Sequence, residues 1–269
     1  MKAKYLLTQH KHIWYRVTGT GKPVVLLHGF AEDSSVWKYQ EKELSEKYQL
    51  IIPDLPGSGR SEMTDDMSIE GMAECIHQLL CSELGNDASS VTIIGHSMGG
   101  HITLAFAEKY PTMLGAFGLF HSTAYPDSNE KKIARQRGIE FIRKHGSYAF
   151  LQQSTPNLFA EVYRTKNASS INDMIEQYKD FDPTALTTYY EAMIQRPDRT
   201  AVLRSFSKPV LFIAGKVDKA VPFEDSMKQC HLPQLSYIHM LENSAHMGMW
   251  EETGKTNTAL TMFLEDLVS

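Results

Sequence analysis

The 269-residue chain is 42% hydrophobic and 22% charged, which is typical of a globular protein and excludes a chain that is disordered throughout. Its length allows one large domain with a sizeable core, or one domain that carries an insertion. The formal net charge is −5 with no block of like charge, which argues against nucleic acid or an anionic membrane surface as a main partner.

The cysteines and the start of the chain narrow the class of protein further. The three cysteines (Cys75, Cys81 and Cys230) are odd in number and lack a framework spacing, which argues against a disulfide scaffold. Residues 1–15 lack the long apolar core and the small-residue cleavage site of a signal peptide. No apolar run approaches the ~20 residues needed to span a bilayer. We therefore expect a cytoplasmic protein, a monomer or homodimer, that acts on a small molecule.

Short apolar runs rich in β-branched residues alternate with longer stretches of helical periodicity. Residues 4–17 predict a hairpin that leads into a sheet. Further strands are predicted at 24–27, 50–52, 91–94, 210–213 and 235–241. Helices are predicted at 35–47, 68–84, 98–110 and 254–268. This alternation predicts an α/β protein with a doubly wound, mostly parallel sheet whose central strands are buried on both faces.

The stretch 123–206 breaks this alternation. It contains helical patterns but no convincing core strand, the patterns lying at 131–145, at 170–179 and from Pro183 onward. The chain then returns to a strand that needs the sheet formed by its first half. We therefore predict a core domain made of residues 1–122 and 207–269, into which residues 123–206 are inserted as a helical cap.

The strongest motif is the sequence Gly-His-Ser-Met-Gly-Gly at 95–100, a G-x-S-x-G that directly follows a buried strand and directly precedes a helix. A sharp turn between strand and helix forces the serine into a strained backbone, and glycines at Gly95 and Gly99 relieve the crowding around it. The turn presents the Ser97 hydroxyl at a helix N-terminus, whose dipole favours developing negative charge. We predict that Ser97 is a nucleophile.

A second turn follows the first predicted core strand, at His28-Gly29-Phe30. Such a turn can aim a backbone N–H at the nucleophile. The N–H groups of Phe30 and Met98 would then form an oxyanion hole, which binds the negative oxygen of a tetrahedral intermediate.

Two further motifs supply candidates for a base and for the acid that orients it. Asp218 lies just past the predicted strand 210–213, on the same rim of the sheet as Ser97. His246 follows the predicted strand 235–241 and precedes the last helix. A buried carboxylate at Asp218 could accept the Nδ1–H of His246, which would leave Nε2 free to take the proton of Ser97. The order Ser, Asp, His along the chain is the one expected for this fold.

These motifs resemble those of the α/β-hydrolase superfamily, and a loop from Asp54 to Ser61 adds to the resemblance. The resemblance spans almost the whole chain and implies a serine hydrolase with Ser97 as nucleophile, Asp218 as acid and His246 as base. It implies that Phe30 and Met98 are the oxyanion donors and that Asp54 is structural. Haloalkane dehalogenases and epoxide hydrolases are similar in layout but carry Asp in place of Ser97, which argues against both.

The expected reaction is hydrolysis of a small carboxylic ester, or of a related acyl substrate, through an acyl-enzyme. It requires no metal or organic cofactor, and no ligand cluster for one is visible in the sequence. Aromatic residues of the cap favour small or aromatic esters, although most of these rings are expected to pack the cap onto the core. Other side chains expected near the pocket are His28, Trp37, His121, Ser122 and Trp250.

Several alternatives use the same three residues. One is hydrolysis of a C–C bond, and another is a menaquinone-pathway type of elimination. Arginines gathered in the pocket would favour the elimination, because its substrate is polyanionic, and the candidates are Arg135, Arg137, Arg143 and Arg164. A perhydrolase is compatible with Met98 after the serine. The alternative outside enzymology is a receptor-like protein that binds a ligand with little turnover.

Overall fold

The computed structural model describes residues 2–8, 10–85 and 88–267. In this part of the chain, eight strands form one sheet in the order β1-β2-β4-β3-β5-β6-β7-β8. β1 pairs antiparallel with β2, and β2 pairs antiparallel with β4, whereas all the remaining neighbours are parallel. The strands are β1 (Lys2–Thr8), β2 (Lys11–Thr18), β3 (Pro23–Leu27), β4 (Gln49–Pro53), β5 (Val91–His96), β6 (Leu114–Phe120), β7 (Val210–Gly215) and β8 (Ser236–Leu241). The predicted hairpin and the mostly parallel sheet are confirmed.

The central strands are buried on both faces, which explains why they appear in the sequence as continuous apolar runs. In β3, Val25 and Leu27 pack into one hydrophobic cluster, while Val24 and Leu26 pack into a second cluster on the opposite face. This division follows from the two-residue period of a strand. One sheet therefore separates two cores.

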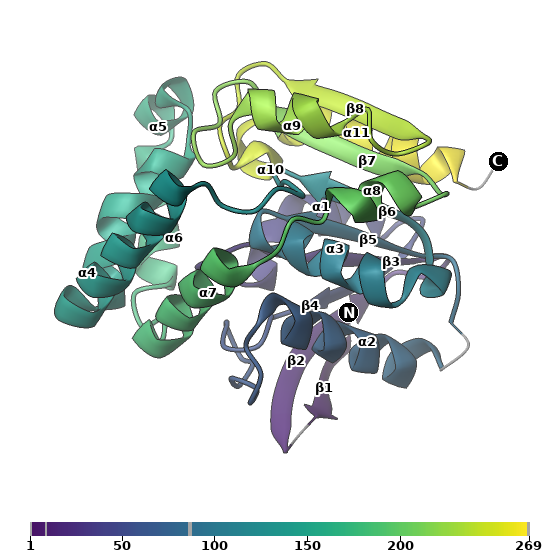
Figure 1. The fold of residues 1–269 in the computed structure, drawn as a ribbon, viewed down its shortest axis with the longest axis horizontal. Coiled ribbons are helices and arrows are strands. Elements are labelled where there is room, and N and C mark those ends of the chain that lie inside the picture. Colours follow the sequence, from purple (N-terminus) through teal and green to yellow (C-terminus); the bar gives the residue numbers. More distant parts are fainter. Residues whose placement is uncertain (1, 9, 86–87, 268–269) are drawn as a thin grey trace.

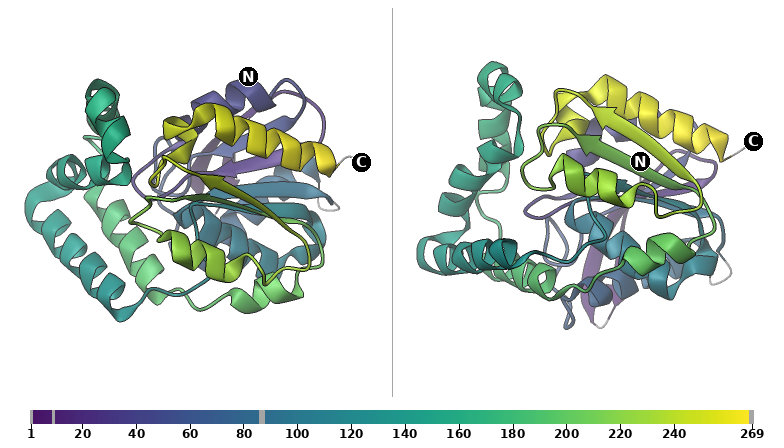
Figure 2. Two further views of the ribbon diagram at one scale, coloured as in Figure 1. Left: turned by 90° about the horizontal axis from the view of Figure 1, so that it is seen from above. Right: turned by 45° about the horizontal axis from the view of Figure 1, so that its top comes forward.

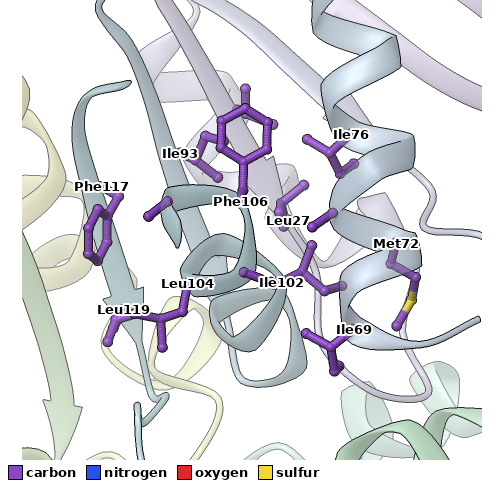
Figure 3. Packing of buried hydrophobic residues seen from close by; sticks show 14 of the residues in the cluster. Leu27, Ile69, Met72, Ile76, Ile93, Ile102, Leu104, Phe106, Phe117 and Leu119 are labelled. Atoms are coloured by element: carbon purple, nitrogen blue, oxygen red, sulfur yellow. The ribbon is translucent and has the colours of Figure 1, made fainter. Parts of the chain in front are cut away.

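Helices cover the two faces of the sheet (Figure 1). Helices α2 (Ile69–Leu84) and α3 (Met98–Lys109) contribute to the first core, which Figure 3 shows in close-up. Helices α1 (Lys38–Leu44) and α11 (Thr253–Asp266) pack against each other on the opposite face. The four helices predicted outside the insertion are thus confirmed, although residue 268 of the predicted last helix lies outside the described residues.

A second group of helices stands at one end of the sheet, apart from the helices on its faces (Figures 1 and 2). We call α4 to α7 the inserted helices, since they lie between β6 and β7 in the chain: α4 (Asn129–Ser154), α5 (Glu161–Lys166), α6 (Ala168–Gln177) and α7 (Pro183–Gln195). The three predicted helical patterns correspond to α4, α6 and α7. Helix α4 extends past its predicted end but is interrupted at Gly146, whose φ of 82° is not helical.

Shorter elements complete the described chain. Helix α8 (Thr200–Ser205) falls within the stretch predicted as the cap, yet it packs against α3 of the core. The other short helices are η1 (Ser34–Trp37), η2 (Pro111–Met113), η3 (Thr155–Leu158), α9 (Phe223–Gln229) and α10 (Gly248–Glu251). Among the residues described, no helix has both the length and the apolar character needed to cross a membrane.

The packing of β5 leads to a prediction about stability. Ile93 is fully buried between α2, α3 and the sheet, whereas Ile133 on α4 is 54% exposed. We expect Ile93→Ala to lower the free energy of unfolding by about 2–5 kcal/mol, because it leaves a cavity in a close-packed core. Ile133→Ala is the control and should change it by less than about 0.5 kcal/mol. Urea denaturation followed by circular dichroism measures both, and equal effects would contradict the packing described.

Candidate active site

Ser97 lies in a tight turn between β5 and α3, with φ of 52° and ψ of −114°. A residue other than glycine rarely adopts this backbone conformation. Neighbouring glycines make the turn sterically feasible: a Cβ on Gly95 would lie 2.3 Å from the carbonyl oxygen of Gly99, and one on Gly99 would lie 2.6 Å from the carbonyl oxygen of His28. The predicted strained turn with flanking glycines is therefore present.

A chain of hydrogen bonds joins three side chains that are far apart in the sequence. His246 Nε2 lies 2.9 Å from Ser97 Oγ, and His246 Nδ1 lies 2.8 Å from Asp218 Oδ2. Because the carboxylate only accepts, Nδ1 carries a hydrogen and donates it to Asp218. In neutral His246, Nε2 then has its lone pair directed at the Ser97 hydroxyl. The structure thus brings together the three residues that the sequence predicted to act together.

The carboxylate of Asp218 accepts four hydrogen bonds, one of them from His246. Its Oδ2 also accepts from Nδ1 of His121 at 3.1 Å, and its Oδ1 accepts the backbone N–H groups of Ala220 and Val221 at 2.8 and 2.9 Å. Burial opposes the charged form, but His246 and the hydrogen bonds from His121 and His246 outweigh it and hold the pKa of Asp218 well below its ordinary value. Asp218 is therefore ionised at neutral pH and fixed in orientation.

His121 contacts Asp218 and, contrary to the expectation from the sequence, does not line the cavity at Ser97. Its backbone is left-handed, with φ of 47°, and its ring is buried. Burial lowers the pKa of His121 to about 4, so the ring is neutral at pH 7 and donates from Nδ1. Its Nε2 has no hydrogen-bond partner among the described residues. His121 is thus a second donor to the carboxylate.

Of the two predicted oxyanion donors, Met98 directly follows Ser97 in the chain, and Phe30 lines the same cavity as Ser97. Met98 is the first residue of α3, where backbone N–H groups have no partner within the helix. Phe30 follows Gly29, whose N–H donates to Glu32 Oε2 at 2.7 Å, so the turn is closed by its own acidic side chain. The ring of Phe30 stacks on Tyr190 of α7, with ring centroids 4.3 Å apart.

Glu32 also takes part in a buried ion pair that the sequence did not suggest. His96 Nδ1 lies 3.0 Å from Glu32 Oε2, and His96 Nε2 lies 3.0 Å from the carbonyl oxygen of His246. Both partners are acceptors, so both ring nitrogens carry hydrogens and His96 is an imidazolium. Burial opposes both charges, yet their attraction lowers the pKa of Glu32 and raises that of His96. The pair links the turn at Phe30 to the loop that carries His246.

A cavity of about 130 Å³ opens at Ser97 and His246 beneath the inserted helices. Residues of the core line it, namely Phe30, Glu32, Ser97, His101, Ala220, Val221 and His246. Residues of the inserted segment 123–206 also line it, namely Thr123, Lys131, Arg135, Leu158, Tyr190, Met193 and Arg196. This segment also touches the loop of His246 directly, because His246 N–H donates to the carbonyl oxygen of Leu158 at 2.9 Å.

The other four side chains expected at the pocket lie elsewhere. His28 is buried under the turn and accepts the N–H of Leu55 at 2.9 Å, and the fully buried Trp37 packs edge-on against Phe120. The Ser122 hydroxyl donates to the carbonyl oxygen of Ser97 at 2.7 Å, which supports the strained turn from below. Trp250 donates to the carbonyl oxygen of Val36. All four side chains make contacts within the folded core and do not line the cavity.

Several residues that line or support the cavity were not predicted. Glu32 and His96 could have been placed near the site from the sequence, because Glu32 lies two residues after Phe30 and His96 directly precedes Ser97. The sequence gives no such indication for Arg196 and Lys131, because only the path of the inserted segment brings them to the core. Of the four arginines considered at the pocket, Arg135 lines the cavity, and Arg143 instead pairs with Glu191 on the surface.

Comparison with known proteins now adds to this geometry. Residues 22–253 match the sequence family described as alpha/beta hydrolase fold. The chain belongs to the α/β-hydrolase family. It is similar to Lipase 3 of Moraxella sp. (strain TA144), at 27% identity over 92% of this chain and 79% of that protein. It is also similar to a thermophilic esterase from Thermogutta terrifontis, solved with malate bound, at 28% identity and a TM-score of 0.92 over the whole of both chains.

A further solved structure shows the same fold at lower identity. An esterase from Exiguobacterium antarcticum superposes with a TM-score of 0.88 at 20% identity, over 98% of this chain.

In the present protein, the loop from Asp54 to Ser61 closes on itself and on η1. Asp54 accepts the N–H groups of Ser34 and Arg60, both at 3.0 Å. Asp54 is therefore tied into the loop as a structural residue.

The buried ion pair leads to a prediction about stability and pH. We expect Glu32→Gln to lower the free energy of unfolding by about 3–5 kcal/mol at pH 5.5, because it leaves the His96 cation buried without its partner. The contribution of Glu32 is present above its ordinary pKa of 4.5 and is lost as the pH falls through its lowered pKa. The contribution of His96 is present below its ordinary pKa of 6.5 and is lost as the pH rises through its raised pKa.

The difference between wild type and Glu32→Gln should therefore be largest between these two pKa values, and smaller at higher and lower pH. Urea denaturation at several pH values measures it. A matched control is available on the surface, where Glu62 lies 3.0 Å from Nδ1 of His12 and both side chains are about half exposed. Glu62→Gln should leave stability close to that of wild type, because solvent screens the exposed pair. A difference that does not vary with pH would contradict the buried ion pair.

Proposed function

We propose that the protein hydrolyses small carboxylic esters, with Ser97 as nucleophile, His246 as general base and Asp218 as the acid that orients it. The observation that carries the proposal is the continuous hydrogen-bond chain from Asp218 through His246 to Ser97, at a serine held in a strained turn. The lipase and esterase relatives support an ester as the substrate.

In the proposed reaction, Ser97 Oγ forms a bond to the ester carbonyl carbon while His246 Nε2 takes the hydroxyl proton. The electron pair of the carbonyl moves onto its oxygen, which the N–H groups of Phe30 and Met98 stabilise. The intermediate then expels the alcohol, which receives its proton from His246, and leaves an acyl group on Ser97. Water attacks the acyl group with His246 again as base, and the acid and free Ser97 are released.

The remaining parts of the site have supporting roles in this proposal. The carboxylate of Asp218, which accepts four hydrogen bonds, keeps Nδ1 of His246 protonated, so that Nε2 faces the nucleophile. We propose that residues 123–206 act as a cap, since the inserted helices close the cavity over Ser97. A volume of about 130 Å³ favours short acyl groups over long lipid chains.

The alternatives use the same residues and remain predictions. Hydrolysis of a C–C bond and elimination both require a base at His246, and a receptor-like protein would require no reactive serine. The names of the relatives, which are lipases and esterases, favour the ester reaction.

A fluorophosphonate probe tests the nucleophile without knowledge of the substrate. We expect the intact mass of the wild type to increase by one adduct, because His246 activates the Ser97 hydroxyl toward phosphorus. Ser97→Ala should gain none and should lower kcat toward phenyl acetate by about 10⁶-fold, to the detection limit of most assays. Ser122→Ala is the control, because Ser122 is a second serine whose hydroxyl contacts the backbone of Ser97, and this variant should still carry the adduct. A folded wild type that takes up no probe and hydrolyses no phenyl acetate would contradict the proposal.

A further inference from the structure

Two arginines and one acid form an unbalanced charge cluster in the wall of the Ser97 cavity. Arg135 Nε donates to Asp127 Oδ2 at 2.6 Å, and Arg196 donates from Nη2 to Asp127 Oδ1 at 2.9 Å. Asp127 and Arg196 are buried, with side chains 0% and 3% exposed. One carboxylate therefore faces two guanidinium groups, each of which stays charged in proteins. Buried charges are normally paired. The Arg135 side chain is 21% exposed, so solvent screens part of this excess, and an anion in the cavity would pair with the rest.

The other charges that line the cavity do not neutralise this excess. Glu32 is already paired with the His96 cation. Lys131 adds to the positive side, although it donates to the carbonyl oxygen of Ala220 at 3.0 Å and burial lowers its pKa. The effect reaches His101 on α3, whose pKa is well below its ordinary value through burial and through the charges of Arg196 and Arg135. The cavity is thus electropositive on the side of the inserted helices.

Arg196 has a hydrogen-bond donor that no described residue satisfies. Its Nη1 donates to the carbonyl oxygen of Met193, and its Nη2 donates to Asp127 and to the carbonyl oxygen of Tyr125. Its buried Nε, however, has no partner among the described residues. A buried donor left unpaired costs free energy, and Arg196 lines the cavity in which a ligand would sit.

A ring stack places this charge close to the serine. The guanidinium of Arg135 lies 5.3 Å from the ring centroid of Tyr190, and that ring stacks on Phe30. Phe30 belongs to the proposed oxyanion turn, so Arg135 lies one aromatic ring away from it. An ester bound at Ser97 would therefore reach the arginines with only a short chain between its carbonyl group and an anionic group.

We infer that Arg135 and Arg196 form a carboxylate-binding subsite next to Ser97, and that the substrates are short esters that carry a negative charge. The inference rests on the proposed ester hydrolysis and names its substrate class. Guanidinium groups suit this role because their N–H donors match the two oxygens of a carboxylate. A neutral ester of the same length would leave the positive charge and the Nε–H of Arg196 without a partner.

The first experiment compares a charged ester with its neutral counterpart. We expect kcat/KM for monoethyl succinate to exceed that for diethyl succinate by about 10- to 100-fold at low salt, the range expected for hydrogen bonds to a charged group. Arg135→Gln should remove most of this preference through KM, and Arg135→Lys should restore part of it. Arg143→Gln is the matched control on α4, because Arg143 pairs with Glu191 outside the cavity, and it should keep the preference.

The outcomes separate the two proposals. Equal kcat/KM for the two esters, with hydrolysis that depends on Ser97, would overturn the charged-substrate inference and leave ester hydrolysis standing. If neither ester is hydrolysed, binding still tests the subsite. Titration calorimetry of succinate with Ser97→Ala should then show binding that weakens at least tenfold with Arg135→Gln added. Binding that is absent, or that is unchanged by Arg135→Gln, would overturn the subsite itself.

Discussion

The backbone at Ser97 is the constraint on which the rest of the site depends. A left-handed φ at a residue with a side chain is unfavourable, so the surroundings must hold it in place. Gly95 and Gly99 allow strand and helix to approach closely, while Ser122 holds the carbonyl oxygen of Ser97. In return, the turn directs the hydroxyl toward His246, at the N-terminus of helix α3, whose dipole favours negative charge.

Charges buried beneath this turn connect the loops around it. The imidazolium of His96 bonds to Glu32 in the turn before η1 and to the backbone of His246 in the loop after β8. These segments are separated by most of the chain, yet each must lie within hydrogen-bond reach of Ser97 or of the proposed oxyanion site. Asp218 bonds to both His246 and His121, so the acid, the base and the end of β6 are held together as well.

The inserted helices contribute side chains to the cavity that differ in chemistry from those of the core. In the proposed reaction, the core supplies the groups that attack a carbonyl and stabilise the resulting oxyanion. The insertion supplies aromatic and cationic side chains that face the same cavity, among them Tyr190 and Arg135. Because the insertion also bonds to the backbone of His246 through Leu158, the walls that would select a substrate and the base that would act on it are mechanically connected.

The sequence by itself determined the sheet, the order of its helices and the positions of Ser97, Asp218 and His246. Strands buried on both faces leave continuous apolar runs, and the strained turn requires glycines at fixed spacing, so these features are local and can be read along the chain. Only the tertiary structure decided which side chains line the cavity. Trp37 and His28 were expected there but are buried in structural contacts, whereas Arg196 was unexpected. The physical reason is that pocket contacts depend on how the inserted helices pack over the core, and no residue spacing encodes that path.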